Sequence, residues 1–321
     1  MSKDISVNNN ALKLVENALK NKEFLRIEQI KESKATIIDT GIKAIGGQSA
    51  GCFVTEASLG GLAKTSICYN NYDNINLPSI FVETSYPTIA TLGAQFAGWN
   101  IKKDKYFAMG SGPARALALK PKKLYDEIGY EDNSETAVIL LETDKIPPVE
   151  VLEYIADECK VDLKNLYTIV APTCSMVGSV QISGRIVETG IHKLHEVGFN
   201  VNKIIYGCGI APIAPLHSDS AICMGRTNDT LCYGGITSYV VDVENDEELM
   251  EIGSKVPSST SRDYGKPFYE TFKAAGFDFY KIDPNLFAPA VIYLNNKKSG
   301  RTYRFGKIND GVLIKSMNIK R

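Results

Sequence analysis

The segment from Val180 to Val197 constrains the fold most, because its polar and apolar residues repeat with the period of a helix. At about 100° per residue, its apolar side chains gather on one side and its polar side chains on the other. The apolar set is Ile186, Val187, Ile191, Leu194 and Val197. The polar set is Arg185, Glu188, His192, His195 and Glu196. The pattern therefore predicts an amphipathic helix whose apolar side packs in a core.

Two glycines, Gly184 and Gly190, lie inside this predicted helix. Each costs roughly 1 kcal/mol relative to alanine at such a position. Something should offset that cost, such as the close approach of another backbone or of a ligand. Alternatively, the helix breaks there and the polar side chains lie on a turn. Both alternatives favour a functional site at this segment over a plain surface helix.

Composition excludes several classes of protein. The net charge of −1 does not favour nucleic acid as a partner. Seven cysteines without a Cys-x-x-Cys pair, and no signal-peptide pattern, predict reduced thiols in a cytoplasmic protein. No run of about 18 apolar residues occurs, so we expect no membrane span.

Strand-like and helix-like segments alternate along the chain, which predicts an α+β or mixed α/β fold. Strand patterns cover 25–40, 62–69, 80–84, 136–141, 166–171, 201–210, 235–243, 287–294 and 311–314. Helical patterns cover 8–20, 88–98, 148–159, 246–256 and 268–276. Residues 221–235 are typical of a turn between apolar segments. We expect an N-terminal domain of residues 1–140 and a C-terminal domain of residues 141–321, which may exchange segments.

A second candidate site is the turn at Gly110, Ser111 and Gly112, which Pro113 joins to a predicted helix. Backbone N–H groups and the helix dipole favour an anion at such a start, and Arg115 adds a positive charge. The spacing matches neither the Walker pattern nor the dinucleotide pattern. A tight turn that only packs explains the same residues.

The pair Arg185 and Glu188 faces one way on a helix, because the two residues are three apart. This arrangement suits a general base that an arginine orients and keeps ionised. It equally suits a surface ion pair that adds little to stability. Glu188 also shares its face with His192 and His195, and zinc uses such ligands. The residues from His192 to Glu196 match no zinc-hydrolase pattern, however, and a solvated helix face explains them as well.

Several longer blocks follow one another in a characteristic order. They are GGQSAGCFVTEASLGGLA, YFAMGSGPARALALK, APTCSMVGSVQISGRIVETGIHKL, MGRTND and SRDYGKPFYE. From about Val7 to about Leu313, the chain resembles the methenyltetrahydromethanopterin cyclohydrolase family of archaeal one-carbon metabolism and methanogenesis. The resemblance implies two α/β domains with a deep pocket between them. It also implies a cytoplasmic homotrimer that uses neither a metal nor an organic cofactor.

The resemblance further implies the activity, which is the reversible hydrolysis of 5,10-methenyltetrahydromethanopterin to 5-formyltetrahydromethanopterin. The catalytic Arg and Glu of the family fall on Arg185 and Glu188. We expect Glu188 to deprotonate the attacking water and Arg185 to keep Glu188 ionised.

The anionic tail of the substrate has candidate contacts that come from physical reasoning alone. These are the Gly110 to Gly112 turn with Arg115, and Arg226 in the turn expected at 221–235. Two other functions stay open at this point. One is a metal-dependent hydrolase that uses Glu188 with His192 and His195, and the other is a non-catalytic pterin-binding protein.

Overall fold

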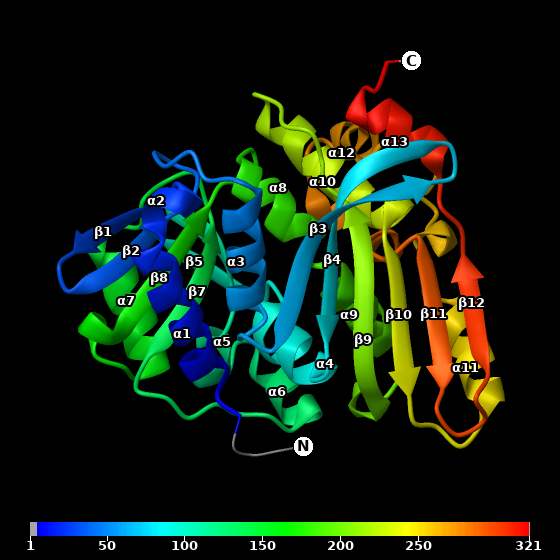
Figure 1. The fold of residues 1–321 in the computed structure, drawn as a ribbon, viewed down its shortest axis with the longest axis horizontal. Coiled ribbons are helices and arrows are strands. Elements are labelled where there is room, and N and C mark those ends of the chain that lie inside the picture. Colours follow the sequence, from blue (N-terminus) through cyan, green and yellow to red (C-terminus); the bar gives the residue numbers. More distant parts are fainter. Residues whose placement is uncertain (1–4, 321) are drawn as a thin grey trace. The chain divides into compact units, whose positions relative to one another are not determined.

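The computed structural model describes residues 5–320, and the chain divides into two compact units (Figure 1). The first unit comprises Met1–Lys64 and Thr88–Gln181, and the second comprises Thr65–Pro87 and Ile182–Arg321. The border expected near residue 140 falls inside a strand of the first unit. These units therefore divide the chain differently from the predicted domains.

The first unit is built on a six-stranded sheet with the order β1-β2-β8-β7-β6-β5. The strands are β1 (Glu28–Glu32), β2 (Ala35–Asp39), β5 (Trp99–Lys103), β6 (Tyr106–Ser111), β7 (Ala137–Glu142) and β8 (Leu166–Ala171). Strands β2, β8 and β7 run parallel, and the outer pairs are antiparallel. Asp39, Glu142 and Ala171 therefore end their strands at the same edge, which is where open α/β sheets bind ligands.

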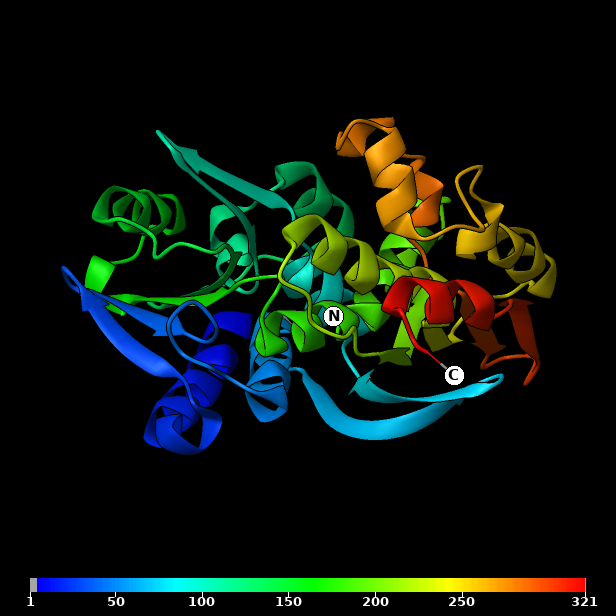
Figure 2. The ribbon, with the colours of Figure 1, turned by 90° about the horizontal axis from the view of Figure 1, so that it is seen from above.

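Helices cover both faces of this sheet, and Figure 2 shows α1 in blue and α7 in green on opposite sides. The helices are α1 (Val7–Lys20), α2 (Lys22–Leu25), α3 (Gln48–Ser58), α4 (Pro87–Ala90), α5 (Ala114–Ala118), α6 (Lys122–Ile128), α7 (Val149–Cys159) and α8 (Met176–Ser183). A π-helical turn spans Thr91–Gln95 and a 3₁₀ turn spans Leu163–Asn165. Ile139 of β7 packs with the α7 side and Val138 with the α1 side. Burial on both faces explains why this strand is apolar throughout.

The second unit is built on another six-stranded sheet, with the order β12-β11-β10-β9-β4-β3 (Figure 1). Its strands are β3 (Ala63–Tyr72), β4 (Ile75–Thr84), β9 (Ile204–Pro212), β10 (Ile236–Val241), β11 (Val291–Asn296) and β12 (Thr302–Gly306). Strands β10 and β11 are parallel, whereas β9 is antiparallel to both β4 and β10. The hairpin of β3 and β4 comes from between α3 and α4 in the sequence, yet it completes this sheet.

The helices of the second unit are α9 (Ile186–Glu196), α10 (Ser220–Gly234), α11 (Asp246–Ser254), α12 (Phe268–Ala274) and α13 (Asp310–Met317). Short 3₁₀ turns span Val201–Lys203, Ser258–Thr260, Phe279–Lys281 and Pro284–Leu286. Helix α9 packs on β9 and β10, and α10 packs on α12 and α13. Two mixed sheets with helices confirm the predicted fold class. Among residues 5–320, no helix has the length and apolar character to cross a membrane.

The prediction of a turn at residues 221–235 is wrong, because this segment forms helix α10. Asp219 caps it by accepting from the N–H groups of Ala221 and Ile222. Asn228 and Thr227 donate to carbonyls one turn earlier, so side chains that usually favour turns are accommodated inside a helix. Packing against α12 and α13 thus overrides the local preference.

The prediction of a strand at residues 311–314 is also wrong, because these residues lie in helix α13. Asn309 caps this helix by accepting from the N–H of Val312. Val312, Leu313 and Met317 are buried, which is a helical spacing rather than the alternation of a strand. The short apolar run alone does not distinguish the two.

Candidate active site

The amphipathic segment forms two helices, because the chain breaks between Ser183 and Ile186. Arg185 is the N-cap residue of α9, with φ −81° and ψ 2°, and its carbonyl accepts from the N–H of Thr189 at 2.8 Å. The alternative of a break at Gly184 is therefore the correct one, and Arg185 lies on the connecting turn. Gly190 instead stays inside α9.

Arg185 and Glu188 form an ion pair of 3.9 Å between Nη1 and Oε2. Their side chains are only 10% and 9% exposed, so the interpretation as a solvated surface pair is wrong. Among the described residues, the carboxylate of Glu188 accepts no hydrogen bond. A buried carboxylate is costly without a positive neighbour, and Arg185 supplies that charge. The geometry thus provides an ionisable acid beside a fixed cation.

Tyr239 of β10 fixes α9 in position, although no sequence pattern pointed to this residue. Its hydroxyl donates to the carbonyl of Val187 at 2.8 Å. A Cβ atom at Gly190 would lie 2.1 Å from this hydroxyl oxygen, which explains the glycine inside the helix. Burial raises the pKa of Tyr239 well above its usual value, and the charge of Glu188 adds to the shift. The phenol therefore remains a neutral donor beneath the pair.

Lys193 is a second buried polar residue of α9 that the sequence pattern missed. It is 4% exposed, and its amine donates to the side-chain carbonyl of Asn285. Burial lowers the pKa of Lys193, and the charges of Asp283 and Glu196 oppose that shift. Lys193 thus ties α9 to the 3₁₀ turn that contains Asn285.

The two histidines of α9 pair with Glu196 rather than with Glu188. Nε2 of His192 lies 3.8 Å from Oε1 of Glu196, and Nδ1 of His195 lies 3.7 Å from the same oxygen. Glu196 is 58% exposed, so these contacts lie at the surface. Within residues 5–320, no group of three His, Cys, Asp or Glu side chains has the arrangement of a metal site. The metal-dependent alternative therefore lacks a geometric basis in this part of the chain.

The turn at Gly110, Ser111 and Gly112 is buried and makes internal contacts. Gly110 and Ser111 end strand β6, where they pair with β7. Gly112 has φ +97°, a conformation that favours glycine, and its N–H donates to the carbonyl of Ala94 at 2.9 Å. This N–H is thus used within the protein, and the helix that follows, α5, has only five residues. These contacts favour the interpretation of a tight turn that packs inside the protein.

Arg115 is completely buried, with 0% of its surface exposed. Its guanidinium donates to the carbonyls of Lys120 at 2.8 Å, Ala94 at 3.0 Å and Leu92 at 3.2 Å. It also lies over the rings of Phe96 and Tyr125, at 5.1 and 5.4 Å from their centroids. These contacts join α5 to the π-helical turn. They give Arg115 a packing role and do not support the expected contact with a substrate.

Arg226 lies in helix α10 and is 9% exposed. Its guanidinium donates to the carbonyls of Ser316 at 3.1 Å, Leu216 at 3.2 Å and Pro215 at 3.3 Å. These bonds hold the preceding loop and the end of α13 against α10. Of the expected site residues, only Arg185 and Glu188 form an ion pair with each other.

Comparison with known proteins gives a consistent result. The model of the family described as "Cyclohydrolase (MCH)" matches residues 6–317. A methenyltetrahydromethanopterin cyclohydrolase of Methanocaldococcus jannaschii is 51% identical over 317 residues, which cover 98% of each chain. Proteins of the same name from Methanococcoides burtonii and Methanosarcina mazei are 50% and 49% identical, over 98% and 99% of this chain and 99% of theirs.

Proposed function

Since this chain belongs to the methenyltetrahydromethanopterin cyclohydrolase family, we propose that Arg185 and Glu188 perform the hydrolysis for which the family is named. The enzyme is a hydrolase that opens a cyclic C–N bond of a small pterin substrate. It converts 5,10-methenyltetrahydromethanopterin and water to 5-formyltetrahydromethanopterin in a reversible reaction. The observation that carries the assignment of residues is the buried ion pair of Arg185 and Glu188.

The proposed reaction begins with a substrate that is already a strong electrophile, because its methenyl carbon carries an amidinium charge. Glu188 takes one proton from water while the water oxygen bonds to this carbon. Glu188 then returns the proton to N10, and the bond between the carbon and N10 breaks. The remaining hydroxyl becomes the formyl oxygen as its proton passes to solvent. The cationic substrate and one water thus yield the neutral formyl product and one proton.

Arg185 has two tasks in this scheme. Its guanidinium stabilises the negative charge of Glu188 before the water attacks the methenyl carbon. We expect the guanidinium also to donate to the oxygen that develops on the substrate carbon.

The test of this proposal is the variant Glu188→Gln in a spectroscopic assay with methenyltetrahydromethanopterin after chelator treatment. The amide keeps the size of the side chain and removes the base, so kcat should fall about 100- to 10,000-fold. Glu196→Gln is the matched control, because it makes the same change on the exposed side of α9 and should retain turnover.

Near-normal turnover of Glu188→Gln would remove Glu188 from the role of base. Loss of wild-type turnover on chelation, with recovery on adding zinc, would favour a metal-dependent hydrolase. Binding of the substrate without turnover would favour a carrier. We also propose a cytoplasmic homotrimer, as the family resemblance implies, and sedimentation equilibrium of the purified protein tests its oligomeric state.

A further inference from the structure

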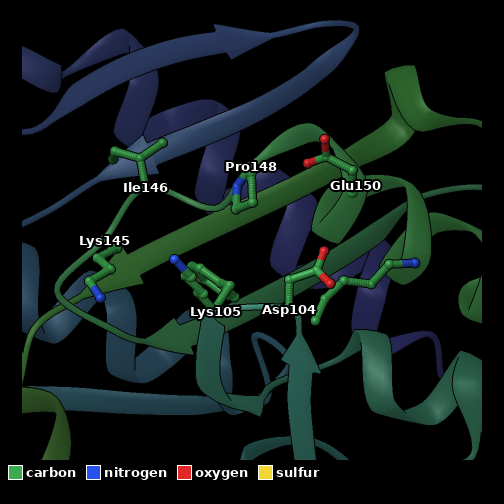
Figure 3. A pocket seen from close by; sticks show the side chains of 8 residues that line it. Asp104, Lys105, Lys145, Ile146, Pro148 and Glu150 are labelled. Atoms are coloured by element: carbon green, nitrogen blue, oxygen red, sulfur yellow. The ribbon is translucent and has the colours of Figure 1, made fainter.

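A groove of about 470 Å³ lies in the first unit, away from helix α9 in the sequence. It is lined by the turn between β5 and β6 and by the loop that joins β7 to α7 (Figure 3). We call the uncharged part of the lining the groove floor. It comprises Tyr106, Ile146 and Pro148, whose side chains consist mostly of carbon atoms. Burial raises the pKa of Tyr106 to about 12, so this floor carries no charge. A floor of this kind suits an apolar or aromatic group.

Lys103, Lys105 and Lys145 line the groove, and the last two give it a cationic side. Figure 3 shows the amines of Lys105 and Lys145 toward one side, and the carboxylates of Asp104 and Glu150 toward the other. Among the described residues, neither Lys105 nor Lys145 forms an ion pair. Glu150 lies in the first turn of α7, where a carboxylate is favoured by the helix dipole. The two amines are therefore available to an anion that enters the groove.

The groove also lies at the edge of the sheet where ligands usually bind. Strand β6 is antiparallel to β7, and Met109 pairs with Glu142 at the carboxyl end of β7. Tyr106 precedes Met109, so it extends past that end toward the loop that contains Lys145. The carboxyl ends of the parallel strands β2, β8 and β7 share this edge.

We propose that this groove binds a small organic anion, with a phosphate or carboxylate group at Lys105 and Lys145 and an apolar part on the groove floor. Ammonium groups bind such anions through charge-assisted hydrogen bonds, and the floor adds apolar contact. The anion is either part of the enzyme's own substrate or a separate metabolite, because the chemistry of recognition is the same.

The test is a calorimetric titration of the full-length protein with phenyl phosphate. Wild type should bind it saturably, and Lys105→Gln/Lys145→Gln should bind it at least about tenfold more weakly. The matched control is Lys13→Gln/Lys34→Gln, which removes two exposed charges elsewhere in the same unit and should match wild type. Ile146→Ser should weaken binding of phenyl phosphate but not of inorganic phosphate. Equal affinity in both double variants, or no saturable binding by wild type, would overturn the proposal.

Turnover measurements with the double variants identify the source of the anion. A raised KM with unchanged kcat in Lys105→Gln/Lys145→Gln alone assigns the groove to the substrate's own anionic group. An unchanged KM with lost phenyl phosphate binding assigns it to a separate anion. This second measurement rests on the proposed function, whereas the titration does not. The titration therefore tests the groove even if the protein does not turn over methenyltetrahydromethanopterin.

Discussion

An arginine precedes a carboxylate by three residues at the start of α9 and again within α10, and the fold uses the two pairs differently. On α9, Arg185 and Glu188 form an ion pair of 3.9 Å. On α10, Arg226 donates to backbone carbonyls, and Asp229 accepts from the N–H of Phe268 at 2.9 Å. The same spacing thus gives one pair whose members contact each other and one pair whose members bond to other parts of the chain.

The difference teaches that burial alone does not identify a catalytic residue. All four side chains are at least nine-tenths buried. What separates them is the identity of their partners, because hydrogen bonds to backbone groups hold α10 in its packing. Glu188 accepts no such bond among the described residues and contacts Arg185 instead. The following predictions challenge this division, beginning with the largest expected effect.

Because of Asp229, the free energy of unfolding should decrease as pH rises through the neutral range. Burial raises the pKa of Asp229 to about 7, although bonds from Ser316 and Phe268 oppose the shift. The folded protein therefore keeps this proton over a range, from about pH 4 upward, in which the unfolded chain has lost it. The stabilisation is complete below that range and is lost as pH rises through about 7, by roughly 4 kcal/mol at most. Urea unfolding of wild type and Asp229→Asn measures it, and the variant should show the smaller decrease.

Asp283→Asn is the control for this experiment. Desolvation alone would raise the pKa of Asp283, but bonds from Asn285, Arg262 and Ser261 lower it. Its stabilisation is present above the unfolded pKa and is lost only as pH falls through the lower folded value. The decrease in the free energy of unfolding around pH 7 should therefore persist in Asp283→Asn. A decrease that also persists in Asp229→Asn would mean that Asp229 is not its source.

Substitution of Arg185 should mainly lower activity, whereas substitution of Arg226 should mainly lower stability. Arg185→Ala removes the charge beside Glu188 and should lower kcat/KM about 100-fold with a modest change in stability. Arg226→Ala leaves three carbonyls in partly buried hydrogen bonds without their donor, so the free energy of unfolding should fall by about 2 kcal/mol. Turnover per folded molecule should then stay within about twofold of wild type. If Arg226→Ala raises KM strongly instead, the original expectation of a substrate contact is restored.

Local sequence patterns predicted α9 and the three-residue spacing of Arg185 and Glu188. The periodicity of an amphipathic helix indicates which residues face the core and which face away from it. Local patterns failed at α10, where Thr227, Asn228 and Asp229 resemble a turn until their partners are known. Those partners include Ser316, which is 87 residues away from Asp229 in the chain. No pattern within one segment contains that information.

The same limitation applies to the prediction for Arg115. A glycine-rich turn before a helix is a frequent anion site, and an arginine beside it strengthens that interpretation. The carbonyls that receive its guanidinium belong to Leu92 and Ala94, in a π-helical turn that no sequence rule predicts. Conversely, Gly190 did predict a close neighbour, and only the structure identifies it as Tyr239.

The smallest expected effect compares the glycines inside the two helices. A Cβ at Gly190 of α9 would meet the hydroxyl of Tyr239 at 2.1 Å, whereas one at Gly225 of α10 would meet Cβ and backbone N of Tyr269 at 2.8 and 3.0 Å. Each alanine variant should lose about 1 to 2 kcal/mol of stability in urea unfolding, because overpacking outweighs the gain in helix propensity. Removing a hydroxyl should relieve only the first clash. In double-mutant cycles, Tyr239→Phe should therefore offset about 1 kcal/mol of the cost of Gly190→Ala, while Tyr269→Phe and Gly225→Ala should be additive. Additivity in both cycles would show that α9 tolerates the extra methyl by shifting on its sheet, and the rigid support proposed for Glu188 would then be lost.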